Sequence, residues 1–201
     1  MLTFRHAALF VACLTASGAA LAQTPAMTRV PGEIVAATPT TLTVKHTTGE
    51  TVEIMAPANT PVLAMKPLTR ADIKTGSFVG IGARKDADGK QTAMQVVVFP
   101  ESARGTGEGH REWNRGADST MTNANVDAVV DSKNGNDVKL SYKGGSQTIT
   151  VPADAKVMTW VPGTRADVMA GKKVVVNATM MDGKPTASRI MVEKDGALPP
   201  M

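Results

Sequence analysis

The sequence predicts an all-β protein made of two tandem copies of one small domain. Two observations lead to this expectation: an internal repeat, and short segments in which apolar and polar residues alternate. The repeat relates "PLTRADIKTGSFVGIGARKDADGK" (67–90) to "PGTRADVMAGKKVVVNATMMDGK" (162–184) and aligns Met65 with Trp160. A unit of about 75 residues is large enough to bury a small core of its own.

The alternation predicts five strands in each copy. In the first copy, Leu42 and Val44 alternate with polar residues, and Val52 and Ile54 do the same after the turn "TTGE". Such a pair of segments is typical of a β-hairpin with one buried face. Asp-Gly turns in "DADG" and "MDG" then lead into the last strand of each copy.

A helical turn is expected within each repeat, at the motif "TRAD". Thr69 and Asp72 have the spacing of an acidic capping box, and Gly76 can end the turn that they begin. The equivalent residues of the second copy are Thr164, Asp167 and Gly171. Five strands with a short helix between strands 3 and 4 is the order of an oligonucleotide/oligosaccharide-binding (OB) barrel, so two OB-like barrels are predicted. A different five-stranded barrel stays open, because periodicity does not fix strand order.

The amino terminus has the features of a secretory signal peptide. A basic start, an apolar run and the small residues before Gln23 predict cleavage after Ala22, and hence a periplasmic or secreted protein. The alternative to cleavage after Ala22 is attachment of a lipid at Cys13. No later segment has the roughly 20 apolar residues of a transmembrane helix. The predicted organisation is a signal peptide (1–22), a first barrel (27–99), a Gly-rich linker (100–120), a second barrel (121–195) and a tail (196–201).

Charge and composition restrict the class of partner. The net charge of +4 is dispersed and only 3% of residues are aromatic, which disfavours nucleic-acid binding through a basic face or stacked bases. No nucleophile, base and acid stand in a recognisable catalytic motif, so no catalytic residue and no cofactor are predicted. The expected function is a non-catalytic binding or adaptor module for an envelope protein or glycan.

The linker holds the candidate binding residues His110, Arg111, Glu112 and Trp113. His110 and Glu112 could share a metal on one side of an extended segment, while Trp113 could stack on a ligand. Two ligands are fewer than zinc usually takes, so the favoured interpretation is a bent connector with Trp113 in the cleft between the barrels.

Soft-metal binding is the alternative function. After signal-peptide cleavage no cysteine remains, so methionine thioethers are the soft ligands available for copper or silver ions. The segments "VMTW" and "LTVKH" resemble features of small periplasmic copper/silver chaperones, which hold the ion with methionines and a histidine beneath a tryptophan. The candidates are His46, His110, Met158, Trp160, Met180 and Met181. They are divided between the copies, whereas the ligands of that family lie in one barrel.

The signal peptide, the repeated "TRAD…G" and the joining "GTGEGHREW…STMTNA" together resemble an uncharacterised family of secreted bacterial proteins. Members are sometimes labelled metal transporter permeases. The resemblance implies tandem OB-like domains and an exported location, and it implies nothing definite about activity.

Overall fold

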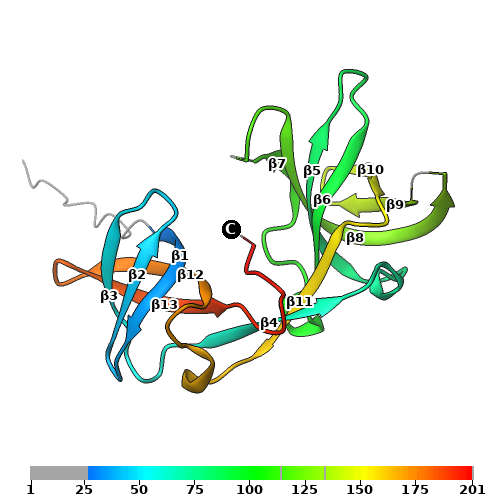
Figure 1. The fold of residues 1–201 in the computed structure, drawn as a ribbon. Helices are drawn as coiled ribbons and strands as arrows, with labels where there is room; N and C mark the ends of the chain where they lie inside the picture. The colour runs from blue at the N-terminus through cyan, green and yellow to red at the C-terminus, as the bar shows by residue number, and fades with distance from the viewer. Residues whose placement is uncertain (1–26, 114, 134, 201) are drawn as a thin grey trace, which may run out of the picture.

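The computed structural model describes residues 27–200, apart from Asn114 and Asn134, as strands joined by turns (Figure 1). The predicted signal peptide and Cys13 lie outside the described residues. The strands are β1 (Thr28–Ala37), β2 (Thr41–His46), β3 (Thr51–Met55), β4 (Val62–Leu68), β5 (Phe78–Lys85), β6 (Gln91–Val98), β7 (Gly109–Glu112), β8 (Ser119–Ser132), β9 (Gly135–Tyr142), β10 (Gly145–Val151), β11 (Lys156–Pro162), β12 (Lys173–Met181) and β13 (Lys184–Val192). Three 3-10 turns complete the fold: η1 (Arg70–Asp72), η2 (Glu101–Ala103) and η3 (Arg165–Asp167).

Five strands form a closed barrel. β5 pairs with β6 and β8, β9 pairs with β8 and β10, and β10 closes the ring through a short parallel pairing with β6. Inside lies a hydrophobic cluster whose fully enclosed members include Ile81, Leu140 and Ile149. The predicted all-β class and five-stranded barrel are therefore confirmed.

A second group of strands contains β1, β2, β3, β12 and β13. The predicted hairpin is present, because Leu42 stands opposite Ile54 and Val44 opposite Val52. β12 adds to β1, β13 adds to β12, and β13 meets β3 only at Thr186 and Met55. A single residue pair therefore joins the edge strands β3 and β13 of this group. The predicted two tandem barrels are not confirmed.

The two copies of the repeat exchange strands. The first hydrophobic cluster combines residues 30–64 with residues 168–192, while the second is built from residues 73–157. The cores therefore do not follow the predicted boundaries of 27–99 and 121–195. The repeat predicts similar units, but alternation within a strand cannot tell which copy supplies its neighbour.

β4 and β11 cross between the two groups of strands (Figure 1). They pair antiparallel, with Met65 directly opposite Trp160. Met65 and Trp160 are equivalent positions of the repeat, so a local two-fold axis relates β4 to β11. Each crossing strand belongs to one copy by sequence and leads from one core to the other.

The "TRAD" segments are single 3-10 turns of three residues each, shorter than the predicted helix. At the first, the Asp72 carboxylate accepts hydrogen bonds from the Thr69 backbone N–H and hydroxyl, both at 2.8 Å. Gly76 follows with φ +85°, a left-handed conformation that glycine adopts without steric cost. The capping arrangement was thus predictable, but the turn ends before Gly76, because Ile73 already has an extended backbone (φ −81°, ψ 102°).

Candidate functional site

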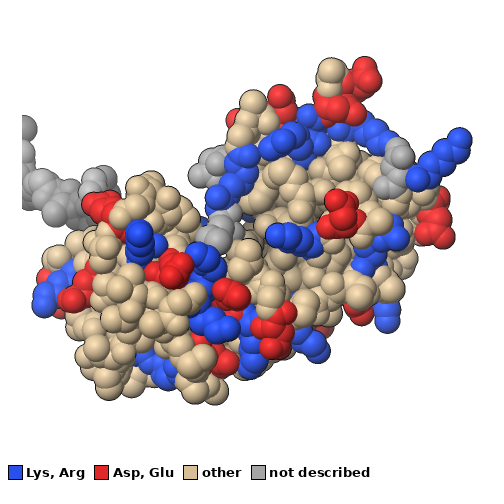
Figure 2. Space-filling view, in the orientation of Figure 1, with Lys and Arg blue, Asp and Glu red and all other residues tan. Residues whose placement is uncertain are grey.

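A cleft of about 720 Å³ lies between the two groups of strands. The two groups form separate lobes in the space-filling view, where acidic and basic side chains are interspersed over the visible surface (Figure 2). The cleft's lining combines side chains of both groups with the crossing strand β11 and the linker. The lining includes Arg29, Gln95, Phe99, Arg111, Trp113, Trp160, Arg189 and Pro200.

Aromatic rings form one part of this lining. Phe99 meets Trp160 edge to face, with ring centroids 4.8 Å apart, and meets Phe78 in the same way at 5.2 Å. Trp113 lies on Gly82 of β5, where an added Cβ would stand 2.7 Å from its Cη2 atom. The absence of a side chain at Gly82 therefore creates the space for the indole.

Three arginines converge on the cleft from three strands: Arg29 of β1, Arg111 of β7 and Arg189 of β13. None has an ion-pair partner among the described residues, and no carboxylate side chain lines the cleft over the same part of the chain. Burial lowers the pKa of Arg29, and the nearby positive charge of Arg115 lowers it further. The cleft therefore offers guanidinium groups that suit carboxylate, phosphate or carbonyl oxygens.

The repeat places different chemistry on the two sides of the cleft. Val96 pairs with Val157 and Ile190 pairs with Val62, so Gln95 and Arg189 occupy equivalent positions in the two copies. Both line the cleft, one as a neutral amide and the other as a cation. The two sides of the cleft therefore differ in charge at equivalent positions of the repeat.

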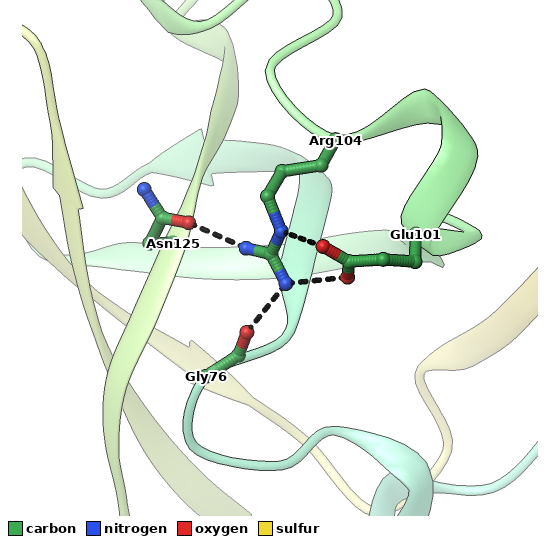
Figure 3. Close-up of polar contacts among 4 residues, drawn as sticks. All are labelled: Gly76, Glu101, Arg104 and Asn125. Carbon is green, nitrogen blue, oxygen red and sulfur yellow. Dashed lines mark hydrogen bonds and ion pairs between the residues drawn. The ribbon is translucent and has the colours of Figure 1, made fainter.

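Arg104 fixes the start of the linker against the barrel (Figure 3). Its guanidinium donates to both carboxylate oxygens of Glu101, to Asn125 Oδ1 at 2.8 Å and to the Gly76 carbonyl at 2.8 Å. The ion pair lowers the pKa of Glu101 and raises that of Arg104. These contacts join the linker to β8 and to the turn after η1.

The linker then forms the strand β7, which pairs with β8. The predicted bent connector therefore contains a regular strand. Arg111 and Trp113 line the cleft, whereas His110 and Glu112 are not among its lining residues. His110 Nδ1 stands 2.8 Å from Thr122 Oγ1, and burial followed by the charge of Lys85 lowers the pKa of the imidazole. Two of the four predicted linker residues therefore line the cleft and two do not. Among the described residues, no third acidic, histidine or cysteine side chain joins His110 and Glu112 in a metal site.

The predicted metal candidates fall into separate places. His46 and Met180 line a second pocket of about 340 Å³. Met158 is buried, only 3% exposed, in a cluster with Met65 against which Trp160 packs. Met181 is 56% exposed, and His110 stacks on Tyr142 at a centroid distance of 6.3 Å. The structure thus unites His46 with Met180 and Met158 with Trp160, but not all six candidates.

The carboxyl-terminal segment enters the cleft. Asp195 and Gly196 have φ angles of +50° and +78°, and the turn is closed by hydrogen bonds between the backbones of Lys194 and Ala197. Beyond this turn Ala197 is buried beside the methionine cluster, and the Arg29 guanidinium donates to the carbonyl oxygen of Pro200. The last described residues therefore occupy part of the space between the lobes.

The sequence matches no protein-family model, and neither the curated proteins nor the solved structures yielded a match. Within the residues described, no helix has the length and apolar character needed to cross a membrane.

Arg29, Arg189, Gln95 and Phe99 were not predicted, because in sequence each is an ordinary residue of a strand or of the segment that follows it. Their convergence depends on the strand exchange, which no local pattern reports. The tail carried a clearer signal, because Asp-Gly at residues 195–196 is a common dipeptide of tight turns.

Proposed function

We propose that this protein is a non-catalytic binding module of the bacterial cell envelope that holds its ligand in the cleft between the lobes. The observation that carries the proposal is the set of three cleft arginines without ion-pair partners among the described residues. All three residues are exposed, so their guanidinium groups can donate to acceptors on a bound ligand. Their convergence therefore supports binding of a ligand that is rich in oxygen acceptors.

The aromatic side chains complement the arginines. Trp113, Trp160 and Phe99 are half-buried, so each combines fixed packing with an accessible portion. Clefts of roughly 300–1,000 Å³ with apolar walls and a few convergent polar groups are typical ligand sites. This arrangement favours a ligand that has an apolar part beside its acceptor groups.

The finer fold and the location belong to the same proposal. Duplication of an OB-like unit followed by strand exchange accounts for both the repeated "TRAD" turns and the mixed cores. Each core would then represent one OB-like barrel assembled from both copies. The features of the leader support export, and the cysteine-free remainder needs no disulfide for stability.

A titration with two defined probes tests the binding function. Hexaglutamate represents a protein ligand and trigalacturonate represents a glycan, while emission of Trp113 and Trp160 reports binding. We expect one probe to give a saturable change, and Arg189→Glu to weaken it at least about tenfold because attraction becomes repulsion. Lys139→Glu on β9 is the control, because it makes the same change of charge outside the cleft residues.

Failure of both probes to bind the chain, with and without residues 198–201, would contradict an acceptor-binding cleft. Equal losses in the Arg189 and Lys139 variants would do so as well, because they would show a general effect of net charge. A signal from only one probe would identify the partner as protein-like or glycan-like.

Soft-metal binding remains a second candidate, because one specific observation favours it. His46 and Met180 line the same pocket, and an imidazole with a thioether suits Cu(I) or Ag(I). Native mass spectrometry under anaerobic conditions should then show one-to-one uptake that Met180→Leu abolishes. Met181→Leu is the matched control, since this neighbouring methionine is not among the pocket's lining residues. Uptake that survives Met180→Leu would refute this assignment.

A further inference from the structure

The last residues of the chain already show how the cleft can hold a peptide. A turn at Asp195 and Gly196 reverses the chain after β13, and the Lys194 ammonium is anchored 3.1 Å from Asp167 Oδ1. The segment that follows is thereby directed back between the lobes. Figure 1 shows this carboxyl-terminal segment, in red, extending between the two groups of strands.

The tail makes two kinds of contact there. Its apolar part is enclosed: Ala197 is only 6% exposed, in the cluster against which Phe99 and Trp160 pack, and Pro199 is buried as well. Its polar part is recognised, because the Arg29 guanidinium donates to the Pro200 carbonyl oxygen. Pro200 itself lines the cleft.

This combination matches a general mode of peptide recognition. Proline restricts the backbone, leaves its carbonyl free to accept hydrogen bonds, and loses little entropy when it binds. Proline-rich segments accordingly bind grooves that combine aromatic side chains with donors to backbone carbonyls. Trp160, Phe99 and Arg29 supply those two elements here.

We propose that the cleft is a binding site for extended, proline-containing peptide segments, and that residues 197–200 are its resident occupant. A partner protein must displace this tail, so the tail lowers the cleft's affinity and selects for partners that match its chemistry. Arg189 remains available for a carboxylate of the partner, as does Arg111, whose Nη1 also donates to the Gly107 carbonyl. The inference rests on the proposed binding function and specifies its ligand class.

Displacement has a thermodynamic consequence. An attached peptide competes at an effective concentration in the millimolar range for a short flexible connection. A free peptide of the same sequence should therefore bind poorly to the full chain and much better to a chain without the tail. The gain should be at least about tenfold if the tail occupies the cleft most of the time.

The experiment compares the mature chain with a variant that lacks residues 198–201 but retains the buried Ala197. The probe is the peptide DGALPPM, and binding is followed by NMR at the two indole N–H signals. We expect saturable shifts of the Trp160 signal in the shortened chain, at least about tenfold weaker binding to the full chain, and weaker binding of the peptide DGALAAM. Arg29→Ala in the shortened chain should also reduce binding.

A second variant releases the tail without shortening it. Gly196→Val places a β-branched side chain at φ +78°, where the turn is strained although space is open. Gly89→Val is the matched control, because Gly89 has φ +79° and equally open surroundings on the β5–β6 turn. Only Gly196→Val should increase binding of DGALPPM.

The outcomes separate the two proposals. A folded, shortened chain that binds hexaglutamate or trigalacturonate but not DGALPPM would overturn the peptide proposal and leave the binding function standing. A shortened chain that binds none of these probes would overturn both. Equal binding of the peptide to the full and shortened chains would show that the tail does not occupy the site.

Discussion

The contact between Gly82 and Trp113 gives the sharpest prediction about how the linker is held. In Gly82→Ala the new methyl group would stand 2.7 Å from the Trp113 Cη2 atom, which is closer than carbon atoms can approach. Over-packing of this kind costs about 1–3 kcal/mol. The ring must leave its place or β5 must shift, so the free energy of unfolding should fall by that amount.

Trp113→Ala has a separate cost that can be estimated. An indole buries roughly 150–250 Å² when it is enclosed. Trp113 is half-buried, so about half of that area at about 25 cal/mol per Å² corresponds to about 2–3 kcal/mol. In this background Gly82→Ala has no ring to meet and should be nearly neutral.

The assay is urea unfolding followed by far-UV circular dichroism for the wild type, both single variants and the double variant. The coupling free energy should be about 1–3 kcal/mol, because the second substitution removes the clash created by the first. Gly82→Ala that destabilises equally with and without the indole would refute the placement of Trp113 on β5. The linker would then be held by other contacts.

Three further predictions concern the core, the linker and pH. Met65→Ala should cost about 2–5 kcal/mol by urea unfolding because Met65 is fully buried, whereas Met181→Ala at an exposed position should change stability by less than about 0.5 kcal/mol. Arg104→Ala should increase amide hydrogen exchange in η2 and β7 relative to β9, and unchanged exchange would contradict its anchoring role. Burial lowers the pKa of His110, so its contribution to stability should be complete above its unfolded pKa of about 6.5 and decline as pH falls toward the folded pKa. Unfolding at a series of pH values should show this decline in the wild type and a smaller one in His110→Gln; identical profiles would exclude the effect.

Local features of the fold were predictable because local chemistry determines them. Alternation placed Leu42 and Val44 on the buried side of a hairpin, and the Thr69–Asp72 spacing indicated the capped turn. The strand exchange was not predictable in this way. Strands of both copies have compatible alternation, so the choice between pairing within a copy and pairing between copies depends on the whole assembly.

The candidate site was predictable only in part, for the same reason. The linker drew attention to Trp113 and Arg111 because it combines glycines with rare residue types, and both residues line the cleft. Arg29 and Arg189 join them only after β12 and β13 pair with β1 and β4. Sequence spacing alone gives no indication of that convergence.

Strand exchange also determines the order in which a newly made chain can fold. Thr28 near the start pairs with Ala178, so the first strands have no complete sheet until almost the whole chain has been synthesised. The closed barrel, by contrast, has all its strands once β10 has emerged at Val151. As strands become available in chain order, folding should therefore begin with the barrel, while the amino-terminal hairpin waits for β12 and β13. Such late completion leaves β1, β2 and β3 without their neighbour β12 for longer than two consecutive domains would.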